Sequence, residues 1–159
     1  MIDGPYLVLA ILGAVVTGLM AGVFCAFSIL VMRGLAALPP AQGVAAMKAI
    51  NSSAMAPAFM ALFLGAAALC LVIAVVTFVL WPDHGTVHLL LGSGLYLCGS
   101  FGVTVMANVP RNDALMKLEP GTPEAVTYWP TYVREWTRWN HVRTAACTAS
   151  ALAYMLAVV

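Results

Sequence analysis

The sequence predicts an all-α integral membrane protein: a bundle of four membrane-crossing helices that forms one domain, residues 1–159. Three observations predict this fold. The 159 residues are 63% hydrophobic and only 8% charged, which leaves too little polar surface to cover a water-soluble globule of this size. Four apolar runs each approach the roughly 20 residues that a bilayer crossing needs. All seven Lys and Arg residues fall in two of the polar segments between these runs.

The first crossing is predicted at residues 5–32, where the apolar run stops at Arg33. It lacks the basic start and the short apolar core of a signal peptide, so it is expected to stay in the mature protein. Gly18 and Gly22 stand one helical turn apart within it. Two glycines at this spacing let a neighbouring backbone approach, so this face is expected to pack against another helix.

The second and third crossings are predicted at residues 53–80 and 87–109. A short helix after the proline pair at residues 39–40 is expected to lead into the second crossing. The third carries small residues at four-residue spacing, which predicts a second close-packing stripe: Gly94, Cys98 and Gly102. Pro110 follows, and because proline cannot donate to the carbonyl one turn back, the helix is expected to break there.

The fourth crossing is predicted at residues 144–159. Aromatic and charged residues recur at helical spacing just before it, at residues 131–143. This pattern predicts a cytoplasmic interfacial helix that continues into the membrane as one long helix.

The basic residues set the predicted orientation. Arg33 and Lys48 lie in the first polar segment, and the other five lie within residues 111–143. Cytoplasmic loops carry the excess of Lys and Arg, so both segments are predicted to face the cytoplasm across a bacterial-type inner membrane, with both termini on the other side. Residues 22–35 can also be aligned with residues 102–115, which leaves two parallel helix-hairpin repeats as a further description of the bundle.

Composition also bounds the partners. A net charge of +1 argues against nucleic acid, because phosphate binding needs a concentrated basic surface. The lipid bilayer is the expected partner, and the glycine stripes leave a homodimer open. Four cysteines lie in separate apolar runs without metal-ligand spacing and are expected to be reduced packing residues: Cys25, Cys70, Cys98 and Cys147. His84 and His88 straddle a predicted turn with only Asp83 beside them, so no metal site is predicted.

The candidate site lies at the cytoplasmic ends of the third and fourth crossings. Asn108 and Asn112 flank Pro110, while Trp136, Asn140 and Arg143 share one face of the last helix. Polar side chains near membrane depth tend to face a cavity or a partner, so three amides and a guanidinium at one level indicate a functional site. The neighbouring aromatic and basic residues are interpreted as interfacial anchors: Tyr128, Trp129, Tyr132, Arg134 and Arg138.

Two longer motifs resemble a known family. NVPRNDAL at residues 108–115 and WTRWNHVRTAA at residues 136–146 resemble the paired motif of the anthrone oxygenase-like family of small four-helix membrane proteins. AGVFCAFS at residues 21–28 and MKAIN at residues 47–51 are similar to that family's first half. Arg111 departs from the family pattern, in which a neutral residue is more usual before the second asparagine.

The resemblance implies oxidation of a flat polycyclic or phenolic substrate, of the anthrone to anthraquinone type, by molecular oxygen and without flavin or haem, so no cofactor is expected. Such chemistry needs removal of a benzylic proton and stabilisation of an enolate. The expected catalytic residues are His141 as the base, with Arg143, Asn140, Asn108 and Asn112 as the oxyanion-stabilising groups. The expected substrate-binding residues are Trp136 and Trp139, which would stack on the ring system, together with Asn51 and Asp113.

Two other classes of function are considered, a non-catalytic membrane module and a small multidrug transporter, and the transporter ranks last. A non-catalytic membrane module would use the pocket for a lipid, a quinone or a small hydrophobic ligand, or would pack against a partner subunit through its glycine stripes, in either case without proton transfer. A small multidrug transporter usually needs a carboxylate within the membrane, and here the carboxylates of the polar segment lie in the loop. Whether the protein is an enzyme, an anthrone oxygenase-type oxidoreductase, is therefore left open by the sequence.

Overall fold

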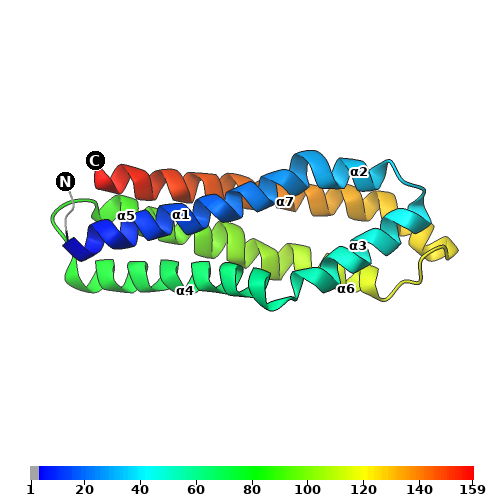
Figure 1. Cartoon of the computed structure of the whole chain (residues 1–159), viewed down its shortest axis with the longest axis horizontal. Helices are drawn as coiled ribbons and strands as arrows, with labels where there is room; N and C mark the ends of the chain where they lie inside the picture. Colours follow the sequence, from blue (N-terminus) through cyan, green and yellow to red (C-terminus); the bar gives the residue numbers. More distant parts are fainter. Residues whose placement is uncertain (1–3) are drawn as a thin grey trace.

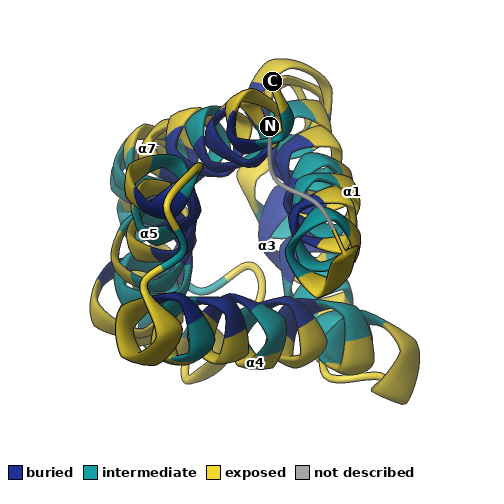
Figure 2. Cartoon of the chain, turned by 90° about the vertical axis from the view of Figure 1, so that its left-hand side faces the viewer, coloured by how far each residue is buried: buried dark blue, intermediate teal, exposed yellow. Residues whose placement is uncertain are grey.

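The computed structural model describes residues 4–159, and these residues are helical apart from short connections, with no strand among them. The long helices lie side by side along the longest axis of the molecule (Figure 1). Viewed end-on, they surround a common centre, and most of their buried residues face it (Figure 2). The all-α prediction is confirmed.

Two of the helical rods contain π-helical hydrogen bonding: the first in its last third and the third near its middle. The first rod consists of α1 (Gly4–Ala26), the π-helical segment η1 (Phe27–Val31) and α2 (Met32–Ala36). The third consists of α5 (Thr86–Gly94), the π-helical segments η2 (Leu95–Gly102) and η3 (Thr104–Asn108), and α6 (Val109–Met116). Wider π turns are uncommon in helices and occur often at functional sites.

The remaining helices begin at prolines, whose missing N–H is unneeded in a first turn. They are α3 (Pro40–Ala54), α4 (Pro57–Leu80) and α7 (Pro123–Val158). Thr122 caps α7 by accepting a hydrogen bond from the backbone nitrogen of Ala125 at 3.3 Å. At the other end of the molecule, Trp81 ends α4 in the left-handed conformation with φ 44°.

Among residues 4–159, three segments are long and apolar enough to cross a membrane: Gly4–Ala36, Pro57–Leu80 and Thr86–Met116. This result is consistent with a membrane protein. The segment predicted as the fourth crossing, residues 144–159, forms the last part of α7. Its passage through the bilayer and the sidedness of the loops stay predictions.

The predicted break at Pro110 is wrong, because the helix continues from η3 into α6 with Pro110 in the first turn of α6. The ring of a proline crowds the carbonyl one turn back, and the wider π turns of η3 just before it accommodate this crowding. The carbonyl oxygen of Ala107 is also occupied, because Arg111 Nη1 donates to it at 2.8 Å.

The close helix contacts use only some of the predicted glycines: a Cβ on Gly18 would lie 4.0 Å from the Cβ of Ala151 in α7. A Cβ placed on Gly22 or Gly94 would meet no atom within 4 Å, so these two positions face outward. A Cβ on Gly99 would lie 2.6 Å from the Cβ of Ala146, and one on Gly92 would meet the ring of Tyr154. The third rod therefore packs on α7 through Gly92 and Gly99. A homodimer through the outward positions stays a prediction.

Two clusters of buried apolar side chains form the core. One joins α1, α4, α5 and η2 to the last part of α7 and includes Ile73, Leu89 and Tyr96. The other joins α2, α3 and α6 to the first half of α7 and includes Val44 and Leu115. The candidate site lies between these two clusters.

Candidate functional site

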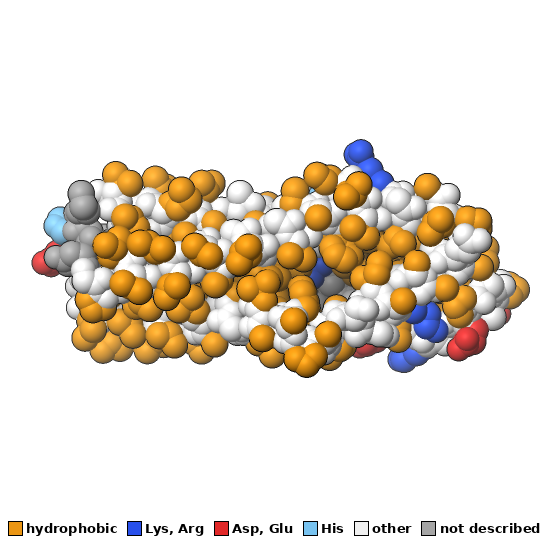
Figure 3. All heavy atoms as spheres, in the orientation of Figure 1, with side chains coloured by type: hydrophobic (Ala, Val, Ile, Leu, Met, Phe, Trp, Pro, Cys, Tyr) orange, Lys and Arg blue, Asp and Glu red, His pale blue; other side chains and the backbone are white. Residues whose placement is uncertain are grey.

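A cavity of about 330 Å³ lies where the two apolar clusters meet. Its walls come from α1, η1, α3, α4, η3, α6 and α7, and they are mostly apolar. Figure 3 shows a hollow at mid-length of the face formed by α1, α3 and α4, with basic side-chain atoms at its floor. The cavity volume is at the lower end of the range of small-molecule sites, roughly 300–1,000 Å³.

Arg143 is the basic residue in the cavity wall, and it is 5% exposed. Its Cζ lies 4.2 Å from the centroid of the Phe24 ring and 5.1 Å from that of Trp136. Its Nη1 donates to Thr104 Oγ1 at 3.1 Å and its Nη2 to the side-chain oxygen of Asn140 at 2.6 Å. Within residues 4–159 no acidic side chain pairs with it, so this buried cation is held only by neutral acceptors and aromatic rings.

Asn140 fixes the position of Arg143. Its side-chain nitrogen donates to the backbone oxygen of Phe24 and to Ser28 Oγ, both at 2.7 Å, while its oxygen accepts from Arg143. The partners on the first rod lie at the junction of α1 and η1, where the π turn begins. Asn140 is fully buried and hydrogen-bonded on both sides, so it acts as a positioning residue.

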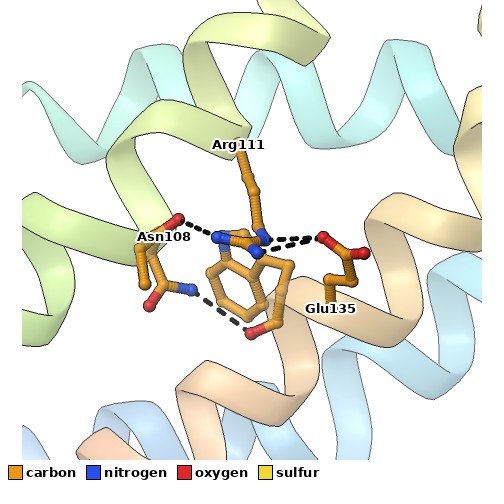
Figure 4. Close-up of polar contacts among 5 residues, drawn as sticks. Asn108, Arg111 and Glu135 are labelled. Atoms are coloured by element: carbon orange, nitrogen blue, oxygen red, sulfur yellow. Dashed lines mark hydrogen bonds and ion pairs between the residues drawn. The ribbon is translucent and has the colours of Figure 1, made fainter.

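Asn108 and Asn112 hold the third rod against α7. Asn108 Nδ2 donates to the backbone oxygen of Trp136 at 3.2 Å, and Figure 4 shows its amide nitrogen directed toward α7. Asn112 Oδ1 accepts two hydrogen bonds, one from Tyr132 Oη at 2.9 Å and one from Trp136 Nε1 at 2.8 Å. Burial raises the pKa of Tyr132, and the Asn51 side chain opposes this rise from nearby without forming a hydrogen bond of normal geometry. The hydroxyl therefore stays protonated and able to donate.

Arg111 lies beside this group but outside the cavity wall. Its Nη2 and Nε contact Glu135 Oε2 at 3.0 and 3.1 Å (Figure 4). The departure from the family pattern at this position therefore leaves the charge of the cavity unchanged, because Glu135 compensates Arg111 at the surface.

Comparison with known families supports the resemblance seen in the motifs. The family model described as anthrone oxygenase matches residues 56–153, which is more than half of the chain. The chain belongs to the anthrone oxygenase family. Neither the comparison with curated proteins nor that with solved structures finds a match.

The family match contains only part of the cavity wall. Asn108, Trp136 and Arg143 lie inside the matched residues, in the third rod and α7. Phe24 and Asn51 lie outside them, on α1 and α3. In this anthrone oxygenase family member the first half of the fold therefore supplies one side of the site.

Most of the residues predicted for the site meet at the cavity. Asn140 lies directly behind Arg143. Five of the predicted residues line the cavity: Asn51, Asn108, Asn112, Trp136 and Arg143.

The structure does not bring His141, Trp139 or Asp113 to the cavity. None of the three lines it, and His141 and Asp113 are exposed. His141 follows Asn140 by one residue, about 100° around the helix, so it faces away when Asn140 faces inward. Its predicted role as the base has no geometric support.

Sequence reasoning missed Phe24, Ser28 and Thr104, and it assigned Tyr132 to the interface although its hydroxyl binds Asn112. Phe24 and Ser28 belong to the early motif at residues 21–28, and Thr104 stands one turn before Asn108. Only the spatial approach of the first rod to α7 shows that these residues meet Asn140 and Arg143.

Three buried polar atoms in the cavity wall have no hydrogen-bond partner: Asn51 Nδ2, Asn108 Oδ1 and Arg143 Nε. Buried polar groups are nearly always paired in folded proteins. A wall with two unpaired donors, one unpaired acceptor and a cation is suited to a ligand that carries oxygen atoms.

Proposed function

We propose that this protein binds a flat aromatic ketone or phenol of the anthrone type as its oxygen anion on Arg143 and oxidises it with molecular oxygen. The single observation that supports this proposal is the buried Arg143 without an acidic partner in a cavity wall. An uncompensated charge costs several kcal/mol of desolvation free energy. An anion that forms beside this charge would be stabilised by it, which gives a reason for the fold to retain it.

The chemistry follows from the acidity of an anthrone. Its CH₂ group lies between two aromatic rings, conjugated with the carbonyl across the ring system, and loss of one proton gives an enolate. A guanidinium near the developing oxyanion stabilises that enolate more than the neutral ketone. Arg143 is already held in place by Asn140 and Thr104, so little reorganisation accompanies the charge transfer.

Oxygen then completes the reaction. The enolate carbon transfers its electron pair to O₂ and forms a C–O bond, which gives a hydroperoxide after protonation. Loss of water from this hydroperoxide leaves a second carbonyl, so one anthrone and one O₂ give one anthraquinone and one H₂O. The four electrons lost by the substrate reduce O₂ to water and to the new carbonyl oxygen.

The cavity supports a flat apolar substrate. Phe24, Phe27 and Trp136 present aromatic surface to it, and Met47 and Met60 supply deformable side chains. The wall includes no histidine or carboxylate. We therefore propose that contact with Arg143 lowers the pKa of the substrate CH₂ group and that water at the cavity opening accepts the proton.

Oxygen uptake tests the proposal. Detergent-purified protein is mixed with a panel of anthrones and hydroquinones, O₂ consumption is followed, and the metal content of the same sample is measured. We expect anthrone-dependent uptake with one O₂ consumed per anthraquinone formed. Uptake no faster than that of protein-free detergent would refute the catalytic proposal.

A second function uses the same cavity without oxidation. The lack of a histidine or carboxylate in the wall favours a binding module for a quinone or another small aromatic ligand. Such a ligand would co-purify with the protein, and its binding would be lost in Arg143→Met without any effect on O₂ uptake.

A further inference from the structure

The unpaired oxygen of Asn108 is the most unusual atom in the cavity wall. Asn108 is 1% exposed, and its Oδ1 has no hydrogen-bond partner although the residue lines the cavity. A buried acceptor without a donor typically costs about 1–3 kcal/mol. The protein would lose this penalty if a ligand supplied the donor.

The direction of this amide is fixed by its other contact. The nitrogen of Asn108 lies 3.2 Å from the backbone oxygen of Trp136, and a carbonyl can only accept. Turning the amide over would place two oxygens against each other. Figure 4 shows the nitrogen on the α7 side and the oxygen pointing away from it.

The other unpaired atoms in the wall have the opposite polarity. Arg143 Nε and Asn51 Nδ2 are donors, and a guanidinium cannot accept. These two groups therefore suit a carbonyl or oxyanion of the ligand, whereas Asn108 Oδ1 suits a hydroxyl.

We propose that Asn108 is a specificity-determining residue, which selects aromatic ligands with a free phenolic hydroxyl in addition to the oxygen that faces Arg143. This inference rests on the proposed function in that it uses the same cavity. It requires binding only and no turnover. A planar ligand with oxygens at two separate edges then satisfies both the donors and the acceptor of the wall.

Binding of unreactive ligands tests the inference. The probes are an anthraquinone with one hydroxyl remote from its carbonyls, so that no internal hydrogen bond occupies it, and the methyl ether of the same compound. Affinities are measured in detergent by quenching of tryptophan fluorescence. We expect the hydroxyl compound to bind the parent protein about tenfold more tightly than the ether, because only it satisfies the acceptor.

Asn108→Leu should abolish this preference, so that the hydroxyl compound and the ether bind with about equal affinity. Asn51→Leu is the matched control, because it removes an unpaired donor: it should weaken both ligands alike and keep the preference. Thermal unfolding and gel filtration check that the variants fold, and Asn108→Ala replaces Asn108→Leu if the leucine does not fit.

Equal affinity of the parent for both probes would overturn the inference, as would failure of both to bind. A preference lost in Asn51→Leu and kept in Asn108→Leu would also overturn it. The oxygen-uptake assay is independent of these results. A protein that prefers the hydroxyl compound but consumes no oxygen would support this inference and refute catalysis.

Discussion

Replacing Arg143 by methionine should greatly reduce anthrone-dependent oxygen uptake while changing the free energy of unfolding little. Methionine keeps most of the side-chain volume and loses the charge. The substitution removes two hydrogen bonds, to Thr104 and Asn140, each worth about 1.5–3 kcal/mol with a charged donor. It also removes the desolvation penalty of a buried charge, which is several kcal/mol.

These opposing terms are of similar size, and both partners left behind, Thr104 and Asn140, are neutral. We therefore expect the free energy of unfolding to change by no more than about 2 kcal/mol in either direction, as measured by thermal unfolding in detergent. The rate of anthrone-dependent oxygen uptake should fall by about 10²–10³-fold, the usual effect of losing one oxyanion-stabilising group.

Arg111→Met is the matched control, because it removes the same kind of side chain outside the cavity. Its ion pair with Glu135 is partly exposed, so its loss should cost no more than about 1 kcal/mol and leave oxygen uptake unchanged. The reasoning is refuted if Arg143→Met keeps full activity, or if both variants lose activity to the same extent.

Three further predictions follow from the structure. His141→Ala should keep parental oxygen uptake, because His141 is exposed and does not line the cavity; a large loss of rate would restore it to the mechanism. Burial raises the pKa of Tyr132 in the folded protein, so the neutral phenol stabilises the fold at pH values below the tyrosine pKa of the unfolded chain, near 10. This stabilisation is lost as the pH rises further, so the thermal unfolding midpoint at alkaline pH should depend less on pH in Tyr132→Phe than in the parent. Gly99→Ala should destabilise the protein by about 1–3 kcal/mol, since its Cβ would lie 2.6 Å from that of Ala146, whereas Gly94→Ala, with nothing within 4 Å, should not lower the thermal midpoint.

The helical fold could be predicted from the sequence because lipid allows few alternatives. Long apolar runs separated by proline and polar residues leave only helices as spanning elements. The continuation of the helix through Pro110 was not predicted, because the rule that proline breaks a helix takes no account of a π turn just before it. The packing glycines were predicted only in part: Gly18 faces α7 but Gly22 and Gly94 face outward, because glycine spacing alone does not show which face of a helix meets its neighbour.

The candidate site was predicted in part. Asn108, Asn140 and Arg143 stood out because amides and a guanidinium at helical spacing are unusual in so apolar a chain. The contribution of the first rod was not predictable, since the contact of Asn140 with Phe24 and Ser28 joins residues more than 100 positions apart. His141 was misplaced because its chemistry, rather than its position on the helix, suggested its role.

The most direct test of the central claim is the absorption spectrum of an anthrone bound to the protein without oxygen. Arg143 is proposed to stabilise the enolate, so the bound ligand should show the enolate band at a pH where free anthrone in the same detergent is neutral. The band should be absent in Arg143→Met. A bound anthrone with the spectrum of the neutral ketone in the parent protein would contradict the account.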